Sequence, residues 1–221
     1  MAWLGRLLGR DWRREEDLPV AASKLGRILE LSAGRDVLDV GCIGGDPGVD
    51  ISRTSHSQIA ARARSCVGID TLESEVERWR KEGYDVVGAD AEAFSFDRKF
   101  DVIVAADLIE HLGNPGRFLQ RAAAHLRSDG RLCIVTPNAG SLNTAVKGIL
   151  GMRVAINPEH TCWFDRTTLR QLLERYGFEV VEEYWQDYQA HPMAALIVHL
   201  RKNLAAHIIL VARLRTRGTS G

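Results

Sequence analysis

The chain of 221 residues has a hydrophobic share of 45% and balances 29 Lys and Arg residues against 29 Asp and Glu residues, for a formal net charge of +0 at pH 7. This size and apolar content suit one domain with a sizeable core, and the neutral balance argues against a dedicated nucleic-acid binder, which normally carries a basic surplus. No apolar run approaches the ~20 residues that a membrane-spanning helix needs, because Arg201 and Lys202 separate the best candidates, 192–200 and 208–212.

Residues 1–20 are predicted to form an amphipathic leader. Within 3–12, Trp and Leu recur at helical spacing, with Arg residues opposite them. Two interpretations stay open: a helix that makes weak peripheral contact with a membrane surface, or a leader that packs on the domain or frays. The acids at 11–17 cancel the basic charge and favour the second interpretation.

The four cysteines show no Cys-x-x-Cys pairing, and the N-terminus lacks the apolar core of a signal peptide. Both observations predict reduced thiols in a cytoplasmic protein. The residues at 214–221 are expected to be a disordered tail.

From residue 21 onwards, predicted helices and strands alternate. Helices are expected over 21–31, after a cap at Thr54 or Ser55, and over 72–82, 115–127 and 166–176. Strands are expected over 37–40, 67–70, 85–89, 100–105, 131–136, 178–184 and 207–213. Short apolar strands separated by helices indicate a parallel sheet that is covered on both faces.

A glycine-rich loop, GCIGGDPG over 41–48, follows the first strand, and the second strand ends on Asp70. A loop poor in side chains lets a ligand approach the backbone closely. An acid at the end of the neighbouring strand can accept hydrogen bonds from ribose hydroxyls. Together these features predict a nucleoside-bearing cofactor at the edge of the sheet.

Five segments, in this order and spacing, resemble the motifs of class I S-adenosylmethionine-dependent methyltransferases. They are VLDVGC at 37–42, GID at 68–70, GADA at 88–91, FDVIVAADLIEHL at 100–112 and LRSDGRLCIVTPN at 126–138. The resemblance covers a single domain over 21–213. It implies an α/β fold: a doubly wound, mostly parallel seven-stranded sheet with an antiparallel last strand, in a Rossmann-like three-layer α/β/α arrangement.

The same resemblance implies S-adenosylmethionine as the cofactor and methyl transfer as the reaction. The expected acceptor is a hydroxyl of a small molecule, a sugar or a hydroxylated metabolite, and no nucleic acid is expected as a partner. The sequence specifies no oligomeric state. A nicotinamide oxidoreductase is disfavoured, because the G-x-G-x-x-G register that cradles a pyrophosphate is absent.

The resemblance also implies a set of cofactor-binding residues: Asp39, Gly41, Gly45, Asp70, Asp90, Ala91 and Asp107. Asp70 is expected to accept from the ribose, and Asp90 and the Ala91 backbone are expected to face the adenine. For Asp39 two roles are open: it holds the glycine loop through backbone hydrogen bonds, which we favour, or it reaches the ammonium group of the cofactor.

Ile43 stands where the family has a glycine, and a β-branched residue does not readily adopt a positive φ. Either the loop follows a shifted path on Gly44 and Gly45, or cofactor binding is weakened or lost. The second case would make the chain a non-catalytic binding protein with the same fold.

Asp107, Glu110 and His111 are expected to share one face of a helical turn. This spacing resembles a magnesium-associated motif of ubiquinone-biosynthesis O-methyltransferases. We favour a role in the wall of the cofactor pocket, so no metal is predicted, and His111 as a general base is a third possibility.

His160 follows in a predicted loop over 139–165 that would cover the acceptor. It is predicted either to deprotonate an acceptor hydroxyl, since its unperturbed pKa lies near ~6.5, or to hydrogen-bond the loop backbone. Trp163 and Phe164 either wall the acceptor pocket or seal the sheet edge. The sequence assigns no role to His56.

Overall fold

The structure is a computed structural model that describes residues 19, 21, 23–44, 48–154, 157–186 and 192–215. The predicted leader helix over 3–12, Gly45 and the predicted tail beyond residue 215 lie outside these residues.

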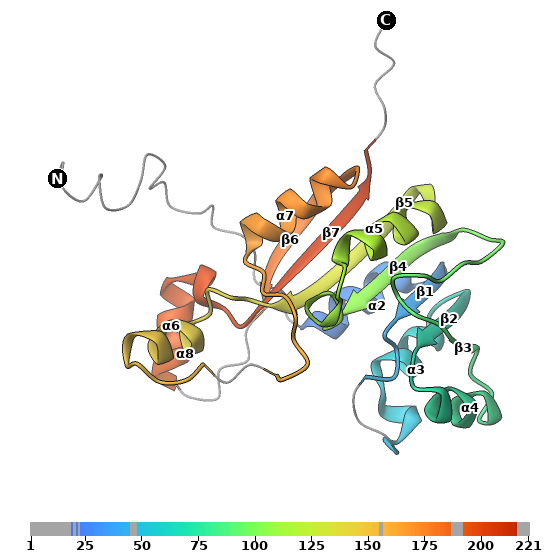
Figure 1. Cartoon of the computed structure of the whole chain (residues 1–221), viewed down its shortest axis with the longest axis horizontal. Coiled ribbons are helices and arrows are strands. Elements are labelled where there is room, and N and C mark those ends of the chain that lie inside the picture. Colours follow the sequence, from blue (N-terminus) through green and yellow to red (C-terminus); the bar gives the residue numbers. More distant parts are fainter. Residues whose placement is uncertain are drawn as a thin grey trace, which may run out of the picture.

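Seven strands form one twisted sheet in the order β3-β2-β1-β4-β5-β7-β6 (Figure 1). They are β1 (Asp36–Val40), β2 (Ser65–Asp70), β3 (Val86–Gly88), β4 (Phe100–Ala106), β5 (Leu126–Pro137), β6 (Phe178–Gln186) and β7 (His207–Leu214). The pairs among β1 to β5 are parallel, whereas β7 runs antiparallel to both of its neighbours. The predicted mostly parallel sheet with an antiparallel last strand is confirmed.

Helices connect the strands: α2 (Lys24–Ser32), α3 (Ser55–Ala60), α4 (Glu73–Lys81), α5 (Pro115–His125), α6 (Leu142–Ile149), α7 (Arg166–Arg175) and α8 (Pro192–Leu200). Short 3-10 helices lie at η1 (Ile51–Arg53), η2 (Ile109–His111) and η3 (Lys202–Leu204). The expected N-caps Thr54, Asn114 and Asp165 each accept a hydrogen bond from the first turn of their helix. Among the described residues, no helix is both long and apolar enough to cross a membrane.

Two predictions about secondary structure were wrong: the end of one helix and the absence of another. The helix expected to reach residue 127 ends at His125, because Leu126 already pairs with Phe100 across a bulge and so begins β5. The segment predicted as a loop over 139–165 contains α6, which starts where the Ser141 side chain accepts a hydrogen bond from the backbone N–H of Thr144.

The apolar side chains of the strands alternate between two faces, and each face is covered by helices. On one face, Phe118 of α5 and Leu169 of α7 pack with Ile103 of β4 in the largest buried cluster. On the other face, Ile28 of α2 and Ile59 of α3 pack against the intervening strand positions. The predicted three-layer arrangement is confirmed, and it leaves the carboxyl ends of the central strands open for a site.

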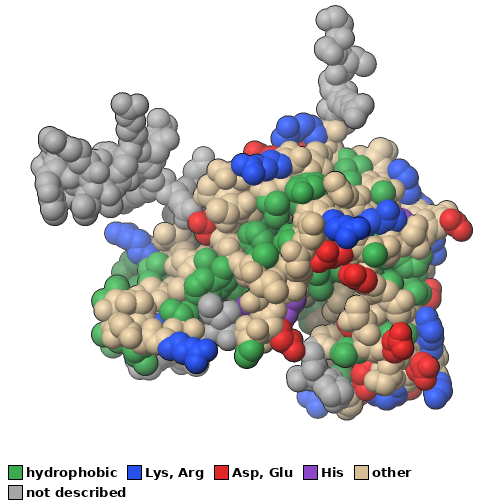
Figure 2. All heavy atoms as spheres, viewed as in Figure 1, with side chains coloured by type: hydrophobic (Ala, Val, Ile, Leu, Met, Phe, Trp, Pro, Cys, Tyr) green, Lys and Arg blue, Asp and Glu red, His purple; other side chains and the backbone are tan. Residues whose placement is uncertain are grey.

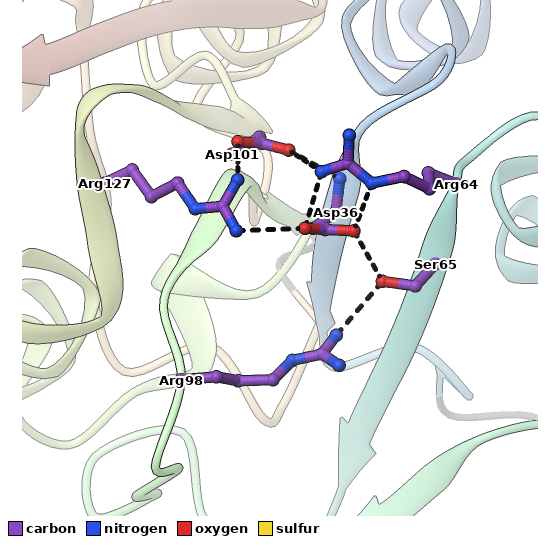
Figure 3. Close-up of polar contacts among 6 residues, drawn as sticks. All are labelled: Asp36, Arg64, Ser65, Arg98, Asp101 and Arg127. Carbon is purple, nitrogen blue, oxygen red and sulfur yellow. Dashed lines mark hydrogen bonds and ion pairs between the residues drawn. The ribbon is translucent and has the colours of Figure 1, made fainter.

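A charged network ties the amino ends of four neighbouring strands together at the opposite edge of the sheet (Figure 3). The Asp36 carboxylate accepts hydrogen bonds from Arg64, at 2.6 and 2.9 Å, and from Arg127 at 3.1 Å. Both guanidinium groups also bind Asp101. Since these residues lie on β1, β4, β5 and the entry to β2, the network aligns the strands far from the carboxyl-end loops.

We expect this network to make the stability of the fold sensitive to acid. Bonding to Arg64 holds the pKa of Asp36 well below its usual value, so the stabilisation is complete above the unfolded-state value of about 3.9. It is then lost as the pH falls through the lower, folded-state pKa. Urea unfolding of the wild type and of Asp36→Asn should therefore differ most near neutral pH and converge in acid. A difference that grows below pH 4 would contradict this role.

Candidate functional site

Two adjoining cavities lie over the carboxyl ends of β1, β2 and β4. The smaller one, of about 210 Å³, is lined by Asp70, Asp90 and Ala91 among other residues, and we call it the Asp70 cavity. The larger one, of about 470 Å³, is lined by Lys24 and Asp107 and is called the Asp107 cavity. Gly41 and His111 line both cavities, so the two lie side by side, and we refer to them together as the elongated hollow.

The glycine loop borders both cavities. Its path bears on whether Ile43, which stands where the family has a glycine, shifts the loop or weakens cofactor binding. Gly41 and Gly44 have φ values of +74° and +70°, whereas Ile43 is not among the described non-glycine residues with positive φ. Gly44 thus adopts the left-handed conformation, which agrees with the part of the shifted-path alternative that concerns Gly44; Gly45 lies outside the described residues. The Ile43 side chain packs in a small apolar cluster with Ile51 and Trp79, and the Asp107 cavity stays open beside it.

Asp70 holds the glycine loop as well as facing its cavity. One carboxylate oxygen accepts a hydrogen bond from the backbone N–H of Ile43 at 3.0 Å, and the other accepts from Leu72 at 3.2 Å. An ionised carboxylate has about four acceptor positions, so capacity remains for two ligand hydroxyls. The alternative of a cap for the following helix was wrong, because α4 begins after Leu72 without a side-chain cap and Asp70 forms a turn with Leu72 instead. The ribose role stays a prediction.

Asp90 lies at the other side of the same cavity, in the turn after β3. Its carboxylate accepts a hydrogen bond from the backbone N–H of Glu92 at 2.8 Å, which makes it a turn-forming residue. Ala91 beside it is buried and lines the cavity wall. The second carboxylate oxygen of Asp90 has no hydrogen bond within the chain among those of the described residues, so it can face a ligand amino group.

Asp39 does not hold the glycine loop in the way that we favoured from the sequence. Its carboxylate instead meets Nδ1 of His56 at 2.9 Å, with both side chains almost fully buried. A Cβ on Gly68 would lie 2.8 Å from the His56 ring, so only glycine leaves room there. The Asp39 side chain lines the Asp107 cavity. It is held in place by His56, to which the sequence assigned no role.

Asp107 does not share a helical turn with Glu110 and His111, so the predicted single turn was wrong, although Asp107 and His111 line the same cavity. Only residues 109–111 are helical, and Asp107 adopts a φ of +51°, the one positive value of a non-glycine residue in the described part of the chain. It forms an ion pair with Lys24 of α2 and lies 3.5 Å from Nε2 of His207. A strained backbone at a strand end, beside a cavity, is typical of a functional position.

Two segments about fifty residues apart are joined next to this hollow. The backbone N–H groups of Thr161 and Cys162 donate to the Glu110 carbonyl, at 2.8 and 3.0 Å. This places the His160 ring edge-on to the His111 ring, with a centroid distance of 4.5 Å. The structure thus brings together the two histidines that the sequence proposed separately as catalytic.

The pKa values of Glu110 and His160, which lie close together, are both shifted in the direction that favours the neutral form. Burial raises the pKa of Glu110 to about 7, and its side chain accepts from Thr136 at 2.8 Å. Burial and the neighbouring His111 lower the pKa of His160. Nδ1 of His160 is buried without a hydrogen-bond partner, and the lowered pKa favours the neutral imidazole.

Glu110, His111 and His160 each offer one ligand atom, and these atoms lie within 4.8 Å of one another. One carboxylate with two imidazoles suits a transition metal better than Mg²⁺, which prefers oxygen ligands. The predicted absence of a metal stays a prediction.

A third cavity of about 530 Å³ begins at His160 and extends under α6 and α8; we call it the His160 cavity. Asn157 lines both this cavity and the Asp107 cavity. Trp163 contributes to the wall, whereas Phe164 is buried in the main core and bridges to Asn138 of the sheet edge. The two aromatic residues thus divide between the two roles proposed for them.

The elongated hollow fits S-adenosylmethionine, the cofactor that the sequence resemblance implies. Acidic groups at Asp70 and Asp90 suit the hydroxyls and the amino group of an adenosine. At the other end, Lys24 and Arg53 can meet a carboxylate, and Asp39 and Asp107 can meet an ammonium or a sulfonium. One carboxylate oxygen of Asp107 lies 3.5 Å from Nε2 of His207, and the residue as a whole lines this hollow.

Lys24, Arg53, His56 and His207 were missed by the sequence analysis. Lys24 comes from the helix before the first strand, and His207 begins the last strand, so only the tertiary fold brings them to Asp107. No local pattern identifies such residues.

Comparisons with known proteins agree with this geometry. The profile of a family described as a methyltransferase domain matches residues 12–183. A probable S-adenosylmethionine-dependent methyltransferase of Mycolicibacterium smegmatis is 34% identical over 157 residues, which make up 70% of this chain and 56% of the relative. The 27-O-demethylrifamycin SV methyltransferase of Amycolatopsis mediterranei is 27% identical, over 54% of this chain and 45% of that relative.

Among solved structures, a SAM-dependent methyltransferase from Archaeoglobus fulgidus matches with a TM-score of 0.63 and 18% identity, over 86% of this chain and 91% of that chain. This match shows a shared fold. The chain spans about half the length of the curated relatives that it matches.

Proposed function

This chain belongs to the class I S-adenosylmethionine-dependent methyltransferases, and from that premise we propose that it methylates a hydroxyl oxygen of a small molecule. The observation that supports this proposal is the position of His160 on the wall of the His160 cavity, with a lowered pKa that favours the neutral imidazole. A hydroxyl acceptor needs such a base, whereas an acceptor that is already ionised does not. The name of the Amycolatopsis relative refers to the O-demethylated form of its substrate, which is consistent with this class of acceptor.

The elongated hollow would hold the cofactor, with the adenosine beside Asp70 and Asp90 and the amino-acid end beside Lys24. When bound there, S-adenosylmethionine supplies a methyl group on a sulfonium centre. Asp107 is placed to stabilise positive charge near that centre. Gly41 lets the chain run close to the cofactor because it takes a left-handed backbone conformation.

The His160 cavity would hold the acceptor. His160 accepts the hydroxyl proton, and the oxygen must lie within ~3 to 3.5 Å of the methyl carbon and in line with the breaking bond. His111 packs edge-on against His160 and fixes the orientation of its ring. Glu110 anchors the segment that carries His160, through the two hydrogen bonds to its carbonyl.

A substrate screen tests the proposed function. Methyl transfer from isotopically labelled S-adenosylmethionine should appear with hydroxylated small molecules and vanish when the accepting hydroxyl is replaced by hydrogen. Label on nitrogen or carbon acceptors alone would contradict O-methylation.

Once an acceptor has been identified, His160→Gln should lower kcat by roughly 10²- to 10⁴-fold, because the general base is lost. Binding of S-adenosylhomocysteine should be unchanged. His199→Gln, on α8 and outside all three cavities, is the matched control. An unaltered kcat in His160→Gln would exclude His160 as the base.

The pH dependence of the wild-type rate tests the same role. Since the pKa of His160 is lowered, the rate should stay constant as the pH falls through 6.5, the ordinary pKa of histidine, and decline only in more acidic buffer.

A further inference from the structure

The two helices around the His160 cavity expose apolar side chains to the surroundings. Along α8, Met193, Leu196, Ile197 and Leu200 stand at positions i, i+3, i+4 and i+7 of one helix face, and their exposed fractions range from 38% to 64%. Surface helices of globular domains normally turn such a face toward the core.

The adjoining segment repeats this pattern. Val146, Ile149 and Leu150 lie on one side of α6 and its C-cap, with Met152 just beyond, and Ile149 is 84% exposed. We call these eight residues on α6, α8 and the turn after α6 the apolar lobe. Figure 2 shows hydrophobic side chains gathered over the part of the molecule that Figure 1 labels α6 and α8.

Charge around the apolar lobe has one sign. Residues 139–158 and 192–206 contain Lys147, Arg153, Arg201 and Lys202 but no Asp or Glu. The whole chain has equal numbers of acidic and basic residues, so this segregation is a local feature. Exposed large apolar side chains bordered by cations are the pattern that binds an anionic lipid surface.

We propose that the apolar lobe docks on an anionic lipid bilayer, with its apolar side chains in the interfacial layer and the cations against the lipid headgroups. A second copy of the chain fits less well, because a two-fold interface would bring the cations of both copies together. The segment 3–12 of the leader was the peripheral contact that the sequence offered, and it lies outside the described residues.

Docking on this lobe would also orient the enzyme. Leu142 and Val146 of α6 and Ala194 of α8 line the His160 cavity, and Val146 belongs to the apolar lobe as well. If the proposed function holds, the mouth of the acceptor cavity then faces the bilayer, which favours acceptors that partition into lipid.

Sedimentation of the full chain with lipid vesicles tests the docking without any methyl transfer. We expect binding to phosphatidylcholine vesicles that contain phosphatidylglycerol, weaker binding to phosphatidylcholine alone, and a decrease with added salt. The double variant Ile149→Ser/Leu196→Ser should lower the partition coefficient by at least about tenfold, since it removes two apolar side chains from the interfacial layer. The double variant Lys147→Gln/Arg153→Gln should reduce the preference for phosphatidylglycerol.

Matched controls replace similar residues elsewhere on the surface. Val181→Ser removes a partly exposed apolar side chain of β6, and Arg62→Gln/Lys81→Gln removes two exposed cations. Neither should alter vesicle binding. Binding of S-adenosylhomocysteine by every variant shows that the fold and the cofactor site are intact, so loss of docking is distinguishable from failure of the proposed function.

Three results would overturn the proposal. The first is a wild-type chain that does not bind vesicles containing phosphatidylglycerol. The second is binding that survives Ile149→Ser/Leu196→Ser but is lost in Trp3→Ser/Trp12→Ser, which would assign the contact to the leader. The third is a dimer in the absence of lipid that Ile149→Ser/Leu196→Ser converts to a monomer, with no vesicle binding by either form.

Discussion

Asp70→Ala should raise the Kd for S-adenosylhomocysteine by roughly 100-fold or more. In the proposed complex its carboxylate accepts from two ribose hydroxyls, and hydrogen bonds to a charged group contribute about 1.5 to 3 kcal/mol each. The substitution also removes the acceptor of the Ile43 N–H, so the glycine loop loses the bond that holds it over β2. Isothermal titration calorimetry measures the change directly.

Two further variants separate the ribose contact from the general effect of losing an acid. Asp85→Ala, at an exposed position just before β3, should bind like the wild type. Asp70→Asn keeps one acceptor oxygen for Ile43 and should fall between the wild type and Asp70→Ala. Near-wild-type affinity in Asp70→Ala, with an unchanged thermal unfolding midpoint, would refute the assignment of Asp70 to the cofactor.

His56→Ala should destabilise the fold by about 3 to 5 kcal/mol, the usual cost of emptying a buried ring site and removing the partner of a buried carboxylate. The His56 side chain is fully buried and bonded to Asp39 at 2.9 Å. It also packs near the rings of Trp79 and Tyr84, at centroid distances of 5.6 and 6.0 Å. Its removal leaves a cavity and a buried carboxylate without its partner. Urea unfolding at neutral pH measures the loss.

A double-mutant cycle with Asp39→Asn tests whether the pair, rather than the ring volume alone, is responsible. In the Asp39→Asn background the cost of His56→Ala should fall, because no uncompensated charge is left behind. Additive costs would show that Asp39 and His56 do not stabilise one another. A loss below about 1 kcal/mol in the single variant would contradict a buried structural role altogether.

The order of the elements could be predicted from the sequence because each central strand is a short apolar run between helix caps. Thr54, Asn114 and Asp165 indicate where helices start, because an N-cap side chain bonds to the backbone of the adjoining first turn and this bond depends little on the rest of the fold. The start of β5 at Leu126 could not be predicted, since it rests on pairing with Phe100 across a bulge. α6 was missed although Val146, Ile149 and Leu150 recur at helical spacing, because the segment was interpreted as a loop that covers the acceptor.

Within the candidate site, sequence patterns identified the groups at strand ends. Asp70, Asp90 and Gly41 lie on the cavity walls because parallel strands present their carboxyl ends at one edge of the sheet. The role of Asp39 was misjudged because its partner His56 lies seventeen residues further on, in a helix that packs beneath β1.

The pairing of His111 with His160 could not be read from the sequence either. It depends on two backbone hydrogen bonds to the Glu110 carbonyl, and backbone bonds between distant segments leave no signature in residue type. The same holds for Lys24, which meets Asp107 only because α2 packs beside the end of β4.

Calorimetric titration of the wild-type chain with S-adenosylmethionine and S-adenosylhomocysteine tests most directly whether the hollow beside Ile43 accepts this cofactor. Gly44 adopts the left-handed conformation, and the Ile43 side chain packs in an apolar cluster beside the cavity. One molecule of either compound should therefore bind per chain, with a Kd on the order of micromolar. The absence of binding heat for both compounds at millimolar concentration, in a chain shown to be folded, would contradict the site and the proposed reaction together.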